Sequence, residues 1–293
     1  MAKPKSLGHP NYVPPLTRVS DLYDTYPMTV WELSAADMHL TLAIKDIVGD
    51  KGEARADSAS MGFRSIDTKG ADAYVSVFNP QIIGTIIDLY RDEIGPFIYD
   101  PFGGGGTRGI ISAYEGYDYL GMEIRDEEVR SIDSNIATIQ SSHGIPSGSC
   151  IMYCGDSRRS PLKDGQADTI ITCPPYWNME KYNGGPDDLS MASTYDQYLD
   201  MLYVVVEECL RVLKPGGLAF WITGLHRDSD GHLLPINRDV QAIHGRLGMP
   251  TREEVILYKR RSTTAPRRMG TYLKGRHLLI RNHEYLTIFT KEA

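Results

Sequence analysis

The amino-acid sequence predicts an α/β fold: a doubly wound, mostly parallel sheet of seven strands, with an antiparallel edge strand. Two observations support this prediction. From about residue 73, short apolar segments of strand length alternate with longer amphipathic segments of helix length. Such alternation is typical of right-handed βαβ units, whose strands run parallel in one sheet. A chain of 293 residues is also long enough to build one large domain of this kind.

The predicted elements follow one another through residues 73–293. Strands are expected at 96–100, 117–123, 150–154, 167–172, 218–223, 255–260 and 284–291. Helices are expected from Pro80 to about residue 94 and at 107–115, 126–140, 194–213 and 235–247. Thr194 and Gln197 have the spacing of a capping box at the start of the clearest helix, and Pro215-Gly216-Gly217 follows its end. The last two strands can pair with each other in an antiparallel manner.

Residues 1–72 show much less pattern, and we treat them as an amino-terminal extension of unknown role. Ser20 to Leu40 mixes apolar and acidic residues at roughly helical spacing. Residues 50–72 are polar and contain scattered glycines and serines, which predicts a loop.

Composition excludes several classes of protein. Hydrophobic residues make up 41% of the chain and charged residues 24%, as in ordinary globular proteins. No apolar run is long enough to span a membrane, and the first residues lack the apolar core of a signal peptide. The four cysteines are too few for a disulfide framework, so a reduced, cytoplasmic protein is expected.

A glycine-rich segment, Asp100-Pro101-Phe102-Gly103-Gly104-Gly105-Gly106-Thr107, stands between a predicted strand and a predicted helix. Glycines allow a close approach of backbone to a ligand, and the helix start offers free N–H groups to an anionic end. A flexible turn explains a bare glycine run equally well. The position at the carboxyl end of a strand favours a nucleotide-like cofactor.

Two acidic residues end the next two strands. Glu123 closes the strand after the glycine segment, where a carboxylate can accept both hydroxyls of a ribose. Asp156, in a Gly-Asp pair after the third strand, could accept the amine of adenine. A solvated strand end and an ordinary turn are the alternatives for these two residues.

The fourth strand ends in Thr172-Cys173-Pro174-Pro175-Tyr176-Trp177. Two prolines fix the backbone and remove two N–H donors, which leaves carbonyl groups free to accept. Acceptors beside an aromatic ring suit a planar base that carries an amino group. An ordinary Pro-Pro loop with core aromatic residues is the alternative.

Together the four segments resemble the S-adenosylmethionine-dependent DNA amino-methyltransferases, which modify N4 of cytosine or N6 of adenine. DPFGGGGT matches the family's Asp-Pro-Phe-x-Gly-Ser-Gly-Thr except at Gly105, and TCPPYW matches Thr-Ser-Pro-Pro-Tyr-Trp except at Cys173. The resemblance extends to the segment at Asn79-Pro80 and covers about residues 75–291. The glycine motif precedes the tetrapeptide, which is the unpermuted order, whereas many relatives with Thr-Ser-Pro-Pro-Tyr are permuted.

The resemblance implies a Rossmann-like fold, the cofactor S-adenosyl-L-methionine and direct methyl transfer to a flipped base. The catalytic residues that it implies are Cys173, Pro174, Pro175 and Tyr176. The cofactor-binding residues that it implies are Asn79, Pro80, Asp100, Phe102, Gly104, Gly106, Thr107, Glu123 and Asp156. Because a thiol is a weak acceptor, amine activation is expected to rest more on the Pro174 carbonyl than on Cys173. A Cys173 thiolate attacking a pyrimidine ring is the less favoured alternative.

A basic segment lies between the last two strands. Residues 258–281 contain eight Lys and Arg and no Asp or Glu, in a chain whose net charge is −7. We therefore expect residues 258–283 to form a basic loop that contacts nucleic acid, with a solvated hairpin loop as the alternative. The residues expected to contact nucleic acid are Trp177, Lys259, Arg260, Arg261, Arg267, Arg268, Lys274 and Arg276. Residues 178–193 are expected to form a mobile loop over the flipped base.

The sequence thus predicts a site-specific DNA methyltransferase of restriction-modification type, with cytosine N4 slightly favoured over adenine N6 as the target. An RNA-modifying relative and a non-catalytic module that binds DNA or cofactor are the alternatives. DNA is the expected partner, and neither a membrane nor a metal ion is expected. A homodimer and a cognate restriction enzyme are left open.

Overall fold

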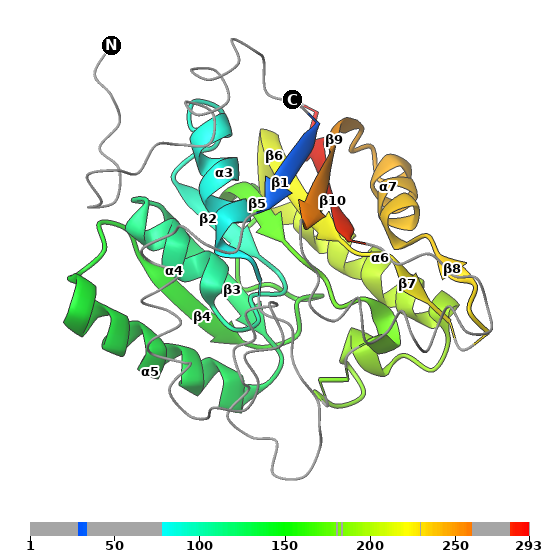
Figure 1. The fold of residues 1–293 in the computed structure, drawn as a ribbon, viewed down its shortest axis with the longest axis horizontal. Helices are drawn as coiled ribbons and strands as arrows, with labels where there is room; N and C mark the ends of the chain where they lie inside the picture. Colours follow the sequence, from blue (N-terminus) through cyan, green and yellow to red (C-terminus); the bar gives the residue numbers. More distant parts are fainter. Residues whose placement is uncertain are drawn as a thin grey trace.

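The computed structural model describes residues 29–33, 78–179, 181–182, 184–228, 230–259 and 282–292. Within these residues, eight strands form one sheet in the order β1-β9-β10-β6-β5-β2-β3-β4 (Figure 1). The strands are β1 (Val30–Leu33), β2 (Phe97–Asp100), β3 (Asp118–Glu123), β4 (Cys150–Cys154), β5 (Ala167–Thr172), β6 (Leu213–Thr223), β9 (Thr251–Lys259) and β10 (His283–Thr290). A separate short hairpin joins β7 (His226–Arg227) to β8 (Leu233–Leu234).

The predicted fold class is confirmed, with two differences in the sheet. β10 runs antiparallel to both β6 and β9, whereas the other neighbouring strands of this sheet pair in parallel. The antiparallel strand therefore lies inside the sheet rather than at its edge. The second difference is β1, which pairs in parallel with β9 and adds an eighth strand.

β1 comes from the segment whose spacing suggested a helix. Val30–Leu33 is extended, so the helical interpretation of Ser20 to Leu40 is wrong at these four residues. Four residues are too few for periodicity to distinguish the two structures. The rest of that segment, and the loop expected at 50–72, lie outside the described residues.

Helices cover the two faces of the sheet in separate groups (Figure 1). The described helices are α3 (Pro80–Tyr90), α4 (Thr107–Tyr114), α5 (Asp126–His143), α6 (Tyr195–Val212) and α7 (Ile236–Arg246). Apolar residues of α3, α4 and α5 share one buried cluster with alternate residues of the strands, and those of α6 and α7 share a second cluster with the intervening residues. Because successive strand side chains point to opposite faces, one sheet serves both cores.

The start of α6 has the side-chain cap that the sequence predicted. The Thr194 hydroxyl accepts a hydrogen bond from the backbone N–H of Gln197 at 3.1 Å, as the cap predicts. The Gln197 side chain accepts from the N–H of Ser193 rather than from that of Thr194. The helix ends at Val212, and Pro215-Gly216-Gly217 lies within β6, where the register with β5 shifts.

The order of the strands reverses between β2 and β5. From β2 the chain proceeds to β3 and β4 on one side, and from β5 it proceeds to β6 on the other. In open α/β sheets, ligands bind at the carboxyl ends of the strands beside such a switch point. The glycine segment follows β2 and the Cys-Pro-Pro-Tyr segment follows β5, so the topology brings both to this place.

Candidate active site

A pocket opens at the carboxyl edge of the sheet beside the switch point. Its lining combines the segments that follow β2, β3, β4 and β5, and adds residues around Tyr182 and Asp188, which belong to the loop 178–193 that the sequence predicted to lie over the flipped base. Residues important below are Phe102, Glu123, Asp156, Cys173, Pro175 and Tyr182.

Asp100 is fully buried at the end of β2 and holds this edge of the sheet together. Its Oδ1 accepts from the Phe102 N–H at 2.9 Å and from the Thr172 hydroxyl at 2.6 Å. Its Oδ2 accepts from Arg108 Nε at 2.5 Å and from the Tyr119 hydroxyl at 2.7 Å. With four donors from its own chain, Asp100 shapes the glycine segment from below, so its role here is to position that segment rather than to touch a ligand.

Arg108 is the cation that balances this buried carboxylate, and the sequence reading did not identify it. Its guanidinium lies 4.7 Å from the centre of the Phe78 ring and also donates to the Phe102 carbonyl. Burial is the largest single effect and acts to lower the pKa of Arg108, but Asp100 and the other neighbouring groups together outweigh burial and raise that pKa. An arginine on an amphipathic helix is normally expected in solvent, so only its fixed distance from Asp100 could have indicated this pairing.

The glycines of the loop differ in whether backbone conformation or lack of space excludes a side chain. Gly104 and Gly106 have φ of +50° and +75°, in the left-handed region that other residues avoid. A Cβ on Gly106 would also lie 2.7 Å from a methyl group of Ile132 on α5. A Cβ on Gly105 would meet nothing nearer than a carboxylate oxygen of Glu128 at 3.8 Å. Gly105, where the resembled family has serine, is therefore the tolerant position.

The segment at Asn79 is built as a helix start. The Asn79 side-chain oxygen caps α3 by accepting from the N–H of Gln81 at 2.9 Å, and Pro80 follows as the buried first helical residue. Thr107 is likewise buried, at the start of α4. The structure thus gives these three predicted cofactor residues clear local roles at two helix starts. None of the three lines the pocket described above.

The acidic residues of the rim are paired with arginines close to them in the chain. Glu123 accepts from the backbone N–H of Arg125 at 2.9 Å and from its Nε at 3.0 Å. Asp156 accepts from two guanidinium nitrogens of Arg158, and the same guanidinium reaches Asp187 at 2.5 Å. Partial burial acts to raise the pKa of Asp156, but the hydrogen bonds from Arg158 hold that pKa below its usual value.

The Cys-Pro-Pro-Tyr segment presents one carbonyl that its neighbours leave free. The Pro175 carbonyl accepts from the hydroxyl of the buried Tyr198 at 2.8 Å, which fixes the segment against α6. No described residue donates a hydrogen bond to the carbonyl of Pro174. The Cys173 sulfur lies 3.3 Å from the Tyr176 hydroxyl. Burial raises the pKa of the Cys173 thiol to about 11, so at neutral pH it is protonated and not a ready nucleophile.

Trp177 anchors the end of this segment in the protein. Its indole N–H donates to the Ala192 carbonyl at 3.0 Å, and its ring meets the Tyr195 ring edge-on at 5.7 Å. Its φ of +50° is unusual for a bulky residue and costs about 1–3 kcal/mol. Backbone strain at such a place is common where a loop must hold a functional geometry.

The predicted loop 178–193 contains fixed turns in its described part. Two short 3-10 helices, η1 (Trp177–Met179) and η2 (Leu189–Met191), lie in or next to it. Asp188 is buried and accepts from the backbone N–H groups of Ser190 and Gly184. The basic residues Arg260, Arg261, Arg267, Arg268, Lys274 and Arg276, and the Lys259 side chain, lie outside the described residues.

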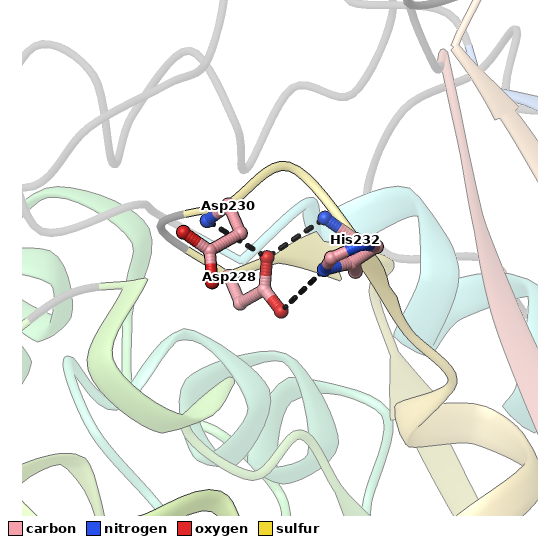
Figure 2. Close-up of side chains that lie close together, drawn as sticks. All are labelled: Asp228, Asp230 and His232. Carbon is pink, nitrogen blue, oxygen red and sulfur yellow. Dashed lines mark hydrogen bonds and ion pairs between the residues drawn. The ribbon is translucent and has the colours of Figure 1, made fainter.

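The described residues include one group whose spacing could suit a metal ion, formed by Asp228, Asp230 and His232 (Figure 2). The group lies in the turn between β7 and β8, and its last two members are exposed. The Asp228 carboxylate accepts from the backbone N–H groups of Asp230 at 3.0 Å and His232 at 2.7 Å. These bonds account for the turn, and we assign no ion to it.

The pocket residues fit a nucleoside-like ligand. Glu123 and Asp156 offer carboxylate oxygens to hydroxyl and amine donors, and each retains acceptor capacity beyond its arginine. Phe102 and Met122 give the pocket apolar walls, as small-molecule sites require. A Cβ on Gly103 would stand 2.5 Å from a methyl carbon of Met152, so the loop packs tightly against β4. No helix among the described residues is long and apolar enough to cross a membrane.

Parts of the chain match known methyltransferases. Residues 167–293 match the family model described as DNA methylase. The type II methyltransferase M.BglII of Bacillus subtilis is 29% identical over 128 residues, which are 43% of this chain and 32% of that protein. M.BamHI of Bacillus amyloliquefaciens is 37% identical over 71 residues, which are 24% of this chain and 16% of that protein. The chain thus spans a third or less of the length of these curated relatives.

Solved structures show a broader likeness. A methyltransferase from Methanosarcina mazei, described as S-adenosylmethionine-dependent, superposes with a TM-score of 0.47 at 14% identity, covering 70% of this chain and 97% of that one. A Thermus thermophilus protein, described as a DNA modification methylase complexed with S-adenosyl-L-methionine, gives a TM-score of 0.36 at 24% identity, covering 47% and 54%. The family match covers residues 167–293, which are less than half of the chain and include the Cys-Pro-Pro-Tyr segment.

Proposed function

We propose that this protein transfers a methyl group from S-adenosyl-L-methionine to the exocyclic amino group of a base in DNA, with cytosine N4 slightly favoured over adenine N6. The observation that carries the proposal is one pocket whose lining includes Phe102 of the glycine segment, Glu123, Asp156, and Cys173 and Pro175 of the Cys-Pro-Pro-Tyr segment. The resemblance of the last segment to the DNA amino-methyltransferases supplies the reaction class. The family match over residues 167–293 supports it.

When bound, S-adenosyl-L-methionine supplies an electrophilic methyl group on a positively charged sulfur. Glu123 would accept hydrogen bonds from the ribose hydroxyls, and Asp156 would accept from the adenine amine. The free N–H groups where α4 begins would face the carboxylate end of the cofactor. Asp100 and Arg108 hold the glycine loop in this shape from beneath.

The Pro174 carbonyl would accept a hydrogen from the target amine. That hydrogen bond draws the nitrogen toward a tetrahedral shape and frees its lone pair for attack on the methyl carbon. The Tyr176 ring would provide a stacking face for the flipped base, a contact worth about 1–3 kcal/mol. Because the Cys173 thiol stays protonated, no covalent bond between enzyme and base is required.

The basic segment 258–281 supports DNA as the substrate. Eight cations without a carboxylate suit contacts to a phosphate backbone. Affinity for DNA is therefore expected to fall steeply as salt is raised, because each phosphate contact releases a counterion. Binding measured at 50 and 200 mM salt tests this expectation.

The decisive experiment is to incubate the full chain with S-adenosyl-L-methionine and unmodified DNA, followed by mass spectrometry of the digested nucleosides. A new N4-methylcytosine or N6-methyladenine is expected, and it names the base. Tyr176→Ala is expected to abolish product while retaining cofactor affinity in calorimetry. Modification of an RNA substrate alone would assign the protein to RNA. Cofactor binding without any product would leave a binding module of the same fold.

A further inference from the structure

Glu284 stands at the same edge of the sheet as the Cys-Pro-Pro-Tyr segment. β10 runs antiparallel to β6, so its first residues lie where β6 ends. Tyr285 pairs with Thr223, the last residue of β6. The preceding residue of β10, Glu284, is therefore the neighbour of Gly224, the first residue after β6.

The pleat places Glu284 on the face of the sheet that Cys173 shares. Leu286, two residues along β10, is buried in the cluster that also contains Ile222 of β6 and Ile171 of β5. Cys173, two residues beyond Ile171, packs against the same cluster. Because alternate residues of a strand share a face, Glu284 and Cys173 lie on one side of the sheet with β6 between them. Adjacent strands are about 4.8 Å apart, so about 10 Å separates their backbones.

The space between them is filled by an aromatic ring. A Cβ on Gly224 would lie 2.5 Å from the Tyr176 ring, so the absence of a side chain there makes room for Tyr176. The hydroxyl of the same ring is the group 3.3 Å from the Cys173 sulfur. Tyr176 thus lies between the thiol on one strand and the β10 end that carries Glu284.

Electrostatic interactions also indicate that Glu284 lies close to Cys173 and Tyr176. After burial, the Glu284 carboxylate is among the groups that raise the pKa of both Cys173 and Tyr176. The other charged groups that act on Cys173 are Arg108 of α4, which lowers its pKa, and Asp100 of β2, which raises it. Asp100 acts from the end of β2, and Glu284 acts from the start of β10.

We propose that Glu284 is the anionic group of the target-base site and supplies the negative potential that Cys173, a weak acceptor, cannot provide. The proposal rests on the proposed amino-methyl transfer. As the amine nitrogen bonds to the methyl carbon, the carbon–sulfur bond breaks with its electron pair on sulfur, and positive charge moves to nitrogen. Glu284 stabilises that charge across Tyr176, and the excess proton of the nitrogen passes to water. Glu284 is thus a positioning residue: it acts through the electrostatic potential at the target amine and does not contact the reacting atoms.

The first test compares Glu284→Gln with Glu253→Gln, which removes an exposed carboxylate from the adjacent strand β9. Glu284→Gln is expected to lower kcat about 10- to 100-fold while KM for DNA and for cofactor changes less than twofold. Glu253→Gln is expected to change neither. Equal thermal unfolding of both variants keeps the comparison free of folding effects. A loss confined to KM would overturn the proposal.

A double-mutant cycle with Cys173→Ser sharpens the test. A serine hydroxyl is a better acceptor than a thiol, so Glu284→Gln is expected to cost at least threefold less in the Cys173→Ser background than in the natural chain. Equal losses in the two backgrounds would mean that Glu284 does not compensate for Cys173, and would overturn the proposal.

A second readout needs no methyl transfer. Iodoacetamide reacts with the thiolate, so the alkylation rate of Cys173 between pH 8 and 10, measured on its peptide by mass spectrometry, reports its ionisation. Glu284→Gln is expected to speed alkylation several-fold, whereas Glu253→Gln leaves the rate unchanged. An unchanged rate in Glu284→Gln overturns the proposal. A faster rate in a chain that methylates nothing upholds the electrostatic coupling and refutes the proposed function instead.

Discussion

The two sides of the candidate site are built in different ways. On the glycine-loop side, the Asp100 carboxylate is fully buried and accepts from four donors, of which three come from other elements. On the rim, Glu123 and Asp156 hold arginines only two residues away, and Asp156 remains partly exposed. The first side is complete before any ligand arrives. The second side consists of local ion pairs whose carboxylate oxygens can also accept hydrogen bonds from a ligand. The glycine-loop side therefore fixes the shape of the site, and the rim supplies the acceptors that bind the ligand.

Among substitutions that test this difference between the two sides, Asp100→Asn is expected to have the largest effect. The amide would face two donors with its own N–H₂ group and would leave Arg108 as an unbalanced buried cation. We expect a loss of about 3–5 kcal/mol in the free energy of unfolding, measured by urea denaturation, together with loss of cofactor binding. Thr172→Val removes a single donor from the same carboxylate and is expected to cost about 1 kcal/mol. If Asp100→Asn cost no more than Thr172→Val, the loop would not depend on this carboxylate.

A smaller effect separates two adjacent glycines of the loop. Gly106→Ala must adopt a left-handed φ and contact Ile132, so we expect a cost of about 1–3 kcal/mol in stability and at least tenfold weaker cofactor binding. Gly105→Ala is the matched control and is expected to leave both unchanged, because its Cβ would make only an ordinary contact with Glu128, at 3.8 Å. Calorimetric titration with cofactor measures the affinities. Equal behaviour of the two variants would contradict the assigned loop geometry.

The smallest effect is expected at the rim. Arg158→Met releases Asp156 and Asp187, and because this pair is partly exposed we expect less than about 1 kcal/mol lost at pH 7. The pKa of Asp156 is lowered in the folded protein, so its contribution is present above its usual pKa of 3.8 and is lost as pH falls through the folded value. Thermal unfolding of the two proteins should therefore differ at pH 6, and the difference should shrink as the pH falls below 3.8. A gap that widens toward acid would reverse this sign.

Much of the site could be predicted because the fold places the ends of its parallel strands close together. Parallel strands linked by helices end at one edge, so Glu123, Asp156 and Cys173 were bound to meet once their strands were recognised. The roles of Arg108 and Tyr198 were not predicted. Their hydrogen-bond partners lie across the sheet or on another element, and no local sequence pattern indicates such a contact. β1 is four residues long, below the length at which periodicity is informative. The reversal of β10 depends on pairing with two distant strands.

The four-donor arrangement at Asp100 also has a consequence for how the protein is made. The glycine loop leaves the ribosome long before Thr172, yet the loop's carboxylate is satisfied only when β5 has docked beside β2. A nascent chain that ends before β5 therefore carries the loop sequence without its supporting contacts. Binding competence then appears late in synthesis, when the strand that bears the Cys-Pro-Pro-Tyr segment is in place, so the growing chain acquires its two half-sites together.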